Sequence, residues 1–196
     1  MGKMRFSYPY GATPIDASEA EELLPRHITT QRELNEWEAL NILQAVNRMS
    51  PKRVQDILDV SFIRTLHRKM FDQTWRWAGK FRTSNKNIGV DWPRIGEETL
   101  KLCGDATLWV RDKVYPADEI AVRFHHRLVW IHPFPNGNGR HARLMADLLI
   151  DRLGLPPFSW GGMNLTVMSA VRKSYIDALR AADRGDVTAL LAFARS

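Results

Sequence analysis

Two strongly helical segments flank a short glycine-rich loop, and this arrangement constrains the fold more than any other feature of the sequence. Ahead of the loop, apolar residues recur at helical spacing: Ile120, Phe124, Leu128 and Ile131. The helix should end at His132-Pro133, because the residue before a proline avoids helical backbone angles. After the loop, residues 140–153 carry apolar side chains around the whole circumference, which is typical of a buried central helix. We therefore predict two packed helices joined by a tight loop.

The remaining sequence predicts more helices and one hairpin. Thr30 and Glu33 form a capping box, which begins a helix that should end near Ser50-Pro51. Further helices are expected over about 53–71, 96–112 and 165–182, with a short one after Asp186. Residues 82–93 instead mix turn-forming and alternating apolar residues, which predicts a short exposed β-hairpin. The expected fold is therefore mainly α.

Length and composition fit one domain with small additions. A chain of 196 residues that is 44% hydrophobic can bury a sizeable core. We expect an N-terminal extension and first helix over 1–52, a core over 53–182 and a C-terminal helix over 183–196. No run approaches the roughly 18 apolar residues of a membrane helix, and the single cysteine, Cys103, permits no internal disulfide. We expect no membrane partner and a reducing, cytoplasmic location.

The net charge of +6 comes from 28 basic and 22 acidic residues. The basic residues are scattered, with local density at Arg123, Arg127, Arg140, Arg143 and Arg152. This distribution suits one polyphosphate site better than a long nucleic-acid track, so we expect no direct nucleic-acid binding. Surface charge without a function is the plain alternative. The lack of a Gly-x-x-x-x-Gly-Lys-Ser/Thr segment argues against a P-loop kinase.

The loop has the composition of a phosphate site. Gly137 and Gly139 let the backbone bend tightly and approach a ligand. The loop leads into a helix N-terminus, whose unpaired N–H groups attract anions. Arg140 and Arg143 can lie on one face of that helix and bind phosphate oxygens. Together these features predict a di- or triphosphate site.

His132 stands at the other end of the loop, where it can act as a general base beside a bound phosphate. The helix N-terminus and the two arginines should disfavour its protonation, which keeps it a base at neutral pH. Phe134 should turn inward and anchor the loop. A capped turn between packed helices is the structural alternative, and it leaves this combination of residues unexplained.

Residues 132–143 resemble the signature of Fic-domain proteins, His-x-Phe-x-(Asp/Glu)-Gly-Asn-Gly-Arg-x-x-Arg. The matching residues are His132, Phe134, Gly137, Asn138, Gly139, Arg140 and Arg143. The Ala-Gly-Lys-Phe-Arg-Thr segment at 78–83 also fits, and the similarity covers roughly 55–182. The whole chain resembles a Fic subgroup known as mobile mystery protein B. The resemblance implies a compact helical bundle that carries a β-hairpin flap.

The resemblance also implies an activity, which is the transfer of AMP from ATP to a Ser, Thr or Tyr hydroxyl of a target protein. His132 would deprotonate that hydroxyl. Gly137, Asn138, Gly139 and Arg140 would hold the α- and β-phosphates, and Arg143 the γ-phosphate. The flap would pair with an extended segment of the target, with Ile88 and Val90 as candidate docking residues. Mg²⁺ would accompany the ATP.

Asn136 departs from the family pattern, because that position usually carries the Asp or Glu that holds Mg²⁺. Three interpretations remain open: weaker metal binding, which we favour, a different transferred group, or nucleotide binding without efficient transfer. The last would make the chain a nucleotide-binding regulatory module. A phosphotransferase of the Doc type is a further alternative. Gly139 argues against it, because those relatives carry Lys there.

Many Fic proteins are restrained by a Glu in a Ser/Thr-x-x-x-Glu-Gly/Asn motif, which pairs with the second motif arginine, here Arg143. Glu33 is the nearest candidate, although Leu34 follows it and Glu33 already belongs to a capping box. Restraint by a separate protein is an equal alternative. The subgroup resemblance implies a small helix-turn-helix partner, which would act like an antitoxin on a toxin-like enzyme.

Overall fold

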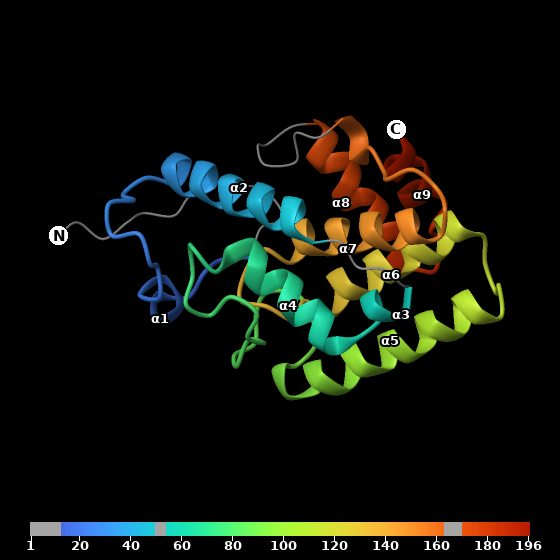
Figure 1. Cartoon of the computed structure of the whole chain (residues 1–196), viewed down its shortest axis with the longest axis horizontal. Coiled ribbons are helices and arrows are strands. Elements are labelled where there is room, and N and C mark those ends of the chain that lie inside the picture. The colour runs from blue at the N-terminus through green and yellow to red at the C-terminus, as the bar shows by residue number, and fades with distance from the viewer. Residues whose placement is uncertain (1–12, 50–53, 163–169) are drawn as a thin grey trace.

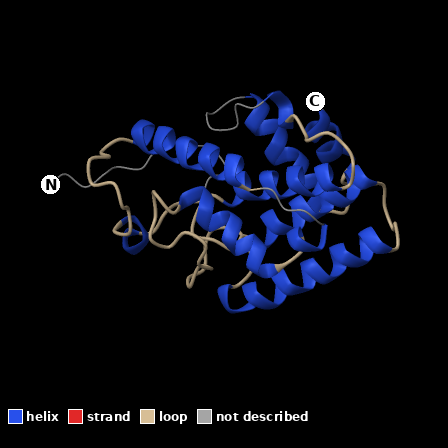
Figure 2. Ribbon diagram, viewed as in Figure 1, coloured by secondary structure: helices blue, strands red, loops and turns tan. Residues whose placement is uncertain are grey.

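The computed structural model describes residues 13–49, 54–162 and 170–196. Within these ranges helices are joined by loops and no strand is present (Figure 2). The predicted mainly α class is therefore confirmed. The predicted helix end at Ser50-Pro51, the helix start at 53 and residues 165–169 lie outside the described residues.

The helices follow one another along the chain, with a long loop between α4 and η1 (Figure 1). They are α1 (Ala17–Ala20), α2 (Gln31–Arg48), α3 (Val54–Ile57), α4 (Val60–Phe71), α5 (Ile95–Arg111), α6 (Ala117–Ile131), α7 (Asn138–Arg152), α8 (Ala170–Asp183) and α9 (Thr188–Arg195). Short 3-10 turns occur at η1 (Trp92–Arg94) and η2 (Trp160–Gly162).

Local side-chain caps decide where two of these helices begin. The Thr30 hydroxyl accepts from the Glu33 N–H and the Glu33 carboxylate accepts from the Thr30 N–H, so the predicted capping box begins α2. The helix predicted over 53–71 is divided into α3 and α4. The Asp59 carboxylate accepts from the N–H groups of Ser61 at 2.7 Å and Phe62 at 3.2 Å, so a new helix begins there.

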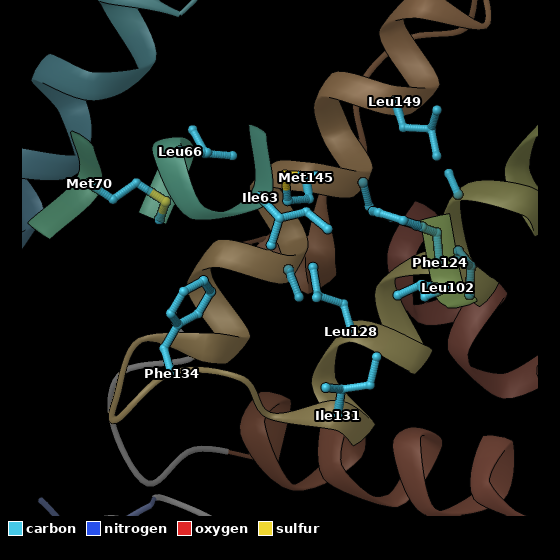
Figure 3. Close-up of a cluster of buried hydrophobic side chains, with 14 of the residues drawn as sticks. Ile63, Leu66, Met70, Leu102, Phe124, Leu128, Ile131, Phe134, Met145 and Leu149 are labelled. Atoms are coloured by element: carbon cyan, nitrogen blue, oxygen red, sulfur yellow. The ribbon is translucent and has the colours of Figure 1, made fainter. Parts of the chain in front are cut away.

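The core surrounds α7, which lies in the middle of the molecule and contacts α3, α4 and α6 (Figure 1). Figure 3 shows how three elements fill the space between them. The buried side chains shown there include Ile63, Leu66 and Met70 of α4, Leu128 and Ile131 of α6, and Met145 and Leu149 of α7. Each fully buried side chain of this size stabilises the fold by about 1.5–3 kcal/mol. The core therefore fixes the ends of α6 and α7, between which the loop lies.

The predicted β-hairpin over 82–93 is not formed, and this segment is a turn-rich loop. The buried Arg82 side chain, rather than hydrogen bonds between strands, holds the two ends of this loop together. Its Nε–H donates to His132 O at 2.8 Å and its Nη1–H to Ser84 O at 2.7 Å, while Nη2–H donates to Val90 O. Because one guanidinium satisfies carbonyls on both sides of the loop, cross-strand pairing is not needed to close it.

The described N-terminal segment, residues 13–24, runs beside the connection that follows α4. The Leu24 N–H donates to Thr74 O at 2.9 Å, and the Arg76 N–H donates to Glu22 O at 3.1 Å. This pairing ties the start of the described chain to the core. None of the helices described has both the length and the apolar character needed to cross a bilayer.

Candidate functional site

The loop between α6 and α7 begins with an unusual backbone conformation at His132. This residue caps α6 with φ 54° and ψ 59°, in the left-handed region. Such angles are uncommon for residues other than glycine, and they are concentrated at functional sites. The conformation persists because the His132 N–H donates to Leu128 O at 3.2 Å and its carbonyl accepts from Arg82.

The His132 ring is buried and held in one tautomer. Its Nδ1 lies 3.2 Å from Val129 O, which can only accept, so Nδ1 carries the hydrogen and Nε2 has a free lone pair. Nε2 lies 2.8 Å from the hydroxyl of Thr13. Burial lowers the pKa of His132 to about 4, with smaller contributions from the charges of Arg82 and Lys86. The ring is therefore neutral at pH 7 and can accept a proton at Nε2.

Asn138 clamps the loop with its side chain. Its Oδ1 accepts from the Phe134 N–H at 2.9 Å, and its Nδ2 donates to Phe134 O at 2.8 Å. The Asn138 side chain is therefore committed to holding the loop, and its backbone N–H belongs to the first turn of α7. The fully buried Phe134 ring fills the space beneath the loop, as an anchor must.

His67 of α4 supports the loop from below, a role that its sequence position did not reveal. Its ring stacks on Phe134 with the centroids 3.7 Å apart. Its Nδ1 accepts from the Gly79 N–H at 3.0 Å, so Nε2 carries the hydrogen and donates to Asn136 O, also at 3.0 Å. Complete burial holds the pKa of His67 well below its usual value, so this neutral tautomer is stable.

The N-terminus of α7 is open to an anion. Gly137 precedes the helix with φ +79°, and a Cβ at this position would lie 2.5 Å from the Phe71 ring. No described side chain caps α7, and the His141 N–H is the first in the helix to find an acceptor, Gly137 O at 2.9 Å. Among the described residues the N–H groups of residues 138–140 find no acceptor, so they form a first turn with the partial positive charge of a helix N-terminus.

The two motif arginines lie close to this first turn, and a third arginine lies near enough for its pKa to feel their charges. Arg140 lies over the Phe71 ring at 5.0 Å, and Arg143 lies over the Tyr175 ring at 5.5 Å. The third is Arg172 of α8, whose pKa is lowered by burial and by the neighbouring charges of Arg143 and Arg140. A cluster of like charges is stabilised by an anion, and Arg172 extends the predicted set.

Glu38 of α2 is a second functional candidate that the sequence reading did not single out. Its Oε2 lies 2.7 Å from Arg140 Nη1, and its Oε1 accepts from Trp75 Nε1 at 2.7 Å. It occupies the buried stripe of α2, which runs Leu34, Glu38, Asn41, Ala45. An acidic residue at helical spacing between apolar residues indicates a buried carboxylate with a partner, because acidic side chains are rarely buried alone.

Glu33, the predicted inhibitory residue, is exposed and acts locally. Backbone N–H groups of Thr29 and Thr30 donate to its carboxylate, and these bonds lower the pKa of Glu33 to about 2. Its contacts within the described part of the chain are those of a helix cap. Among the described residues the carboxylate that pairs with a motif arginine is Glu38, and the arginine is Arg140.

Asn136, the predicted metal ligand, is engaged within the protein. Its Oδ1 accepts from the Gly137 N–H at 2.7 Å, and its Nδ2 donates to Thr13 O at 3.2 Å. Within the described ranges no group of three or more His, Cys, Asp or Glu side chains is arranged to hold a metal ion. A neutral amide whose oxygen is already occupied fits Mg²⁺ poorly, because this ion prefers charged oxygen ligands.

The covering loop, residues 84–91, lies over His132. A Cβ at Gly89 would lie only 2.6 Å from the His132 Cβ, so glycine permits this close approach. Of the two predicted docking residues, Ile88 is 43% exposed and Val90 is buried. The Val90 N–H donates to Ile131 O and its carbonyl accepts from Arg82. The Val90 backbone therefore has no free group to offer a docking strand.

Residues 57–150 match the sequence profile of the Fic/DOC family. This match covers just under half of the chain and includes the whole segment from His132 to Arg143.

Curated proteins of known name are also similar to this chain. The protein adenylyltransferase fic-1 of Caenorhabditis briggsae is 33% identical over 114 residues, which are 56% of this chain and 21% of the relative. The protein adenylyltransferase Fic of Nematostella vectensis is 26% identical over 163 residues, which are 80% of this chain and 36% of the relative. The chain thus spans about a third or less of the length of these relatives.

Solved structures share the fold. Fic-1 (aa134–508) from C. elegans superimposes with a TM-score of 0.67 at 23% identity, covering 91% of this chain and 52% of that one. The BepC protein of Bartonella tribocorum, solved with bound AMPPNP, gives a TM-score of 0.66 at 19% identity, covering 92% of this chain and 97% of that one. The predicted Fic-type helical bundle is therefore confirmed.

Proposed function

We propose that this chain is a protein adenylyltransferase, which transfers AMP from ATP to the hydroxyl of a Ser, Thr or Tyr side chain on a target protein. One observation carries the proposal. Neutral, buried His132 presents Nε2 to a hydroxyl 2.8 Å away, beside an uncapped helix N-terminus. Transfer of a nucleotide to a hydroxyl needs this combination of base and anion site. The names of the relatives and the AMPPNP bound to BepC support ATP as the donor.

In the proposed reaction His132 Nε2 accepts the proton of the target hydroxyl, whose oxygen attacks the α-phosphorus of ATP. The bond between the α-phosphorus and the oxygen that bridges to the β-phosphate breaks, and pyrophosphate leaves. The first-turn N–H groups of residues 138–140 and the Arg140 guanidinium would hold the α- and β-phosphates, and Arg143 the γ-phosphate. Donors fixed in place before the reaction stabilise the charge that develops as pyrophosphate departs.

Mg²⁺ is proposed only as a companion of the nucleotide. The phosphate oxygens would supply most of its ligands, and Asn136 Oδ1, which already accepts from the Gly137 N–H, would contribute at most one neutral ligand. No step of the proposed reaction depends on a protein-held ion. The weaker metal binding that we expect from Asn136 follows from this arrangement.

We also propose a reducing, cytoplasmic setting for the enzyme. Cys103 is buried and its thiol pKa is raised to about 12 by burial, which suits an inert cysteine in a reducing, cytoplasmic environment. The toxin-like role and the helix-turn-helix partner rest on the subgroup resemblance. A target would approach across the covering loop, where Ile88 is exposed.

Parallel incubations with α-labelled and γ-labelled ATP test the reaction, with a cell extract as the source of acceptors. We expect α-label on protein, and a rate about 10²–10⁴-fold lower for His132→Ala. His126→Ala is the matched control, because His126 pairs with Asp183, which lies outside the loop. Incorporation of γ-label alone would identify a phosphotransferase. Nucleotide binding without transfer of either label would indicate that the chain is a nucleotide-binding regulatory module.

A further inference from the structure

Thr13 occupies the place beside the base where an acceptor hydroxyl belongs. It is only 6% exposed, and its Oγ1 lies 2.8 Å from His132 Nε2 although the two residues are 119 positions apart. Its carbonyl accepts from Asn136 Nδ2 at 3.2 Å. Thr13 is therefore bound at both ends of the candidate site, to the base and to the residue that begins the turn into α7.

The direction of the Thr13 hydrogen bond matches proton abstraction. Because Nδ1 of His132 donates to Val129 O, Nε2 can only accept, and the Thr13 O–H must be the donor. A hydroxyl that donates to a neutral imidazole at this distance is the geometry of a nucleophile and its general base. A purely structural threonine would make the same hydrogen bond.

The segment that carries Thr13 is anchored to the covering loop by a buried cation. The Lys86 side chain is 2% exposed, and its Nζ lies 2.7 Å from Asp16 Oδ2 and 2.6 Å from Glu19 Oε2. The Ser84 hydroxyl also donates to Asp16 Oδ2, at 3.1 Å. Residues 13–19 thus lie against the loop on which we propose that a target docks. A tethered acceptor needs no bimolecular encounter, which favours its reaction.

We propose that Thr13 is an intramolecular acceptor, so that the chain adenylylates its own N-terminal segment. This inference rests on the proposed function. The Thr13 oxygen forms a bond to the α-phosphorus of ATP, and the bond from that phosphorus to the oxygen bridging the β-phosphate breaks. The hydroxyl proton passes to His132 Nε2, and pyrophosphate leaves with the electron pair. The product is an AMP phosphodiester on Thr13.

Intact-mass measurement and peptide mapping after incubation with ATP test the assignment. We expect one AMP on the peptide that contains Thr13 in the wild type and in Thr13→Ser, and none on that peptide in Thr13→Val or His132→Ala. Ser18→Ala is the matched control, because Ser18 is an exposed hydroxyl on the same docked segment. It should be labelled as fully as the wild type. Loss of label in Ser18→Ala with label retained in Thr13→Val would overturn the inference.

Mixing two chains tests whether the transfer is intramolecular. A tagged His132→Ala chain is incubated with untagged wild type and ATP. Because each active chain should modify only itself, we expect Thr13 labelled on the wild type and unlabelled on the tagged partner. The first-order rate constant should also be independent of protein concentration. Equal labelling of both chains would show intermolecular transfer and overturn the inference.

The cell-extract assay separates failure of this inference from failure of the proposed function. Label on extract proteins, with an unmodified Thr13 peptide, would overturn the intramolecular acceptor and leave the adenylyltransferase standing. No transfer to any acceptor by the wild type or by Thr13→Val would overturn both. Asp16→Asn with Glu19→Gln should lower labelling of Thr13, because these changes loosen the segment from Lys86 and leave the bond between His132 and Val129 in place.

Discussion

At the residue scale, burial, tautomer and backbone conformation together determine how His132 can act as a base. Its basicity is set by the absence of water, since burial is the largest cause of its low pKa. The bond from Nδ1–H to Val129 O fixes which nitrogen accepts the proton. A base with so low a pKa is fully available at neutral pH, although each proton transfer to it is correspondingly less favourable.

The pH dependence of transfer follows from this low pKa. His132 is active when neutral, so the rate should stay constant from pH 8 down to about pH 5 and fall with a midpoint near 4. Single-turnover incorporation of α-label measures the profile, and circular dichroism at each pH checks that the chain is folded. A midpoint near 6.5 in the folded chain would show that His132 is solvated during the reaction.

At the element scale, side chains rather than backbone ladders position the site. The buried Glu38 side chain of α2 pairs with Arg140 on α7. Arg82 binds the covering loop to the end of α6. Arg140 therefore lies between two possible partners, the Glu38 carboxylate and a bound phosphate. The strength of the first contact should limit the strength of the second.

Replacement of Glu38 by Gln should therefore strengthen ATP binding. Gln keeps an acceptor for Trp75 Nε1 but removes the charge that pairs with Arg140. We expect the Kd for ATP to fall about three- to tenfold, which is roughly 0.7–1.4 kcal/mol. Calorimetric titration measures it, with Glu36→Gln as the matched control on the exposed face of α2. A larger effect from Glu33→Gln would instead restore the predicted role of Glu33.

Sequence reasoning succeeded where the determinants are local. Apolar spacing and Pro133 predicted the end of α6, and the capping box of Thr30 predicted the start of α2. The hairpin prediction was wrong because Arg82 supplies the loop with side-chain bonds that alternation cannot reveal. The contact between Thr13 and His132 was out of reach, because it joins distant segments that only tertiary packing brings together.

At the scale of the whole molecule, the fold buries several uncharged histidines in one core. Burial lowers the pKa of His125 and His141 to about 3 and that of His132 to about 4, and it holds that of His67 well below normal. Asp147 acts in the opposite sense, because burial raises its pKa to about 6. The histidines outnumber it, so protons bind preferentially to the unfolded chain below about pH 6.5.

The free energy of unfolding should therefore fall as the pH decreases from 7 to 5. Each histidine that titrates only in the unfolded chain adds a slope approaching about 1.4 kcal/mol per pH unit. Urea titrations at several pH values measure the slope. His125→Gln should flatten it by removing one such group. A flat profile in the wild type would show that the buried histidines are solvated.

The double attachment of Arg82 has a mechanical consequence. One guanidinium binds both Val90 O on the covering loop and His132 O beneath it. A movement of the loop should therefore also move the backbone of His132. A partner that lifts the loop must strain the bond that fixes the base, whereas one that presses the loop down tightens it. If a partner on the loop changes the affinity of His132 for a bound acceptor by some factor, that acceptor must change the affinity of the loop for the partner by the same factor.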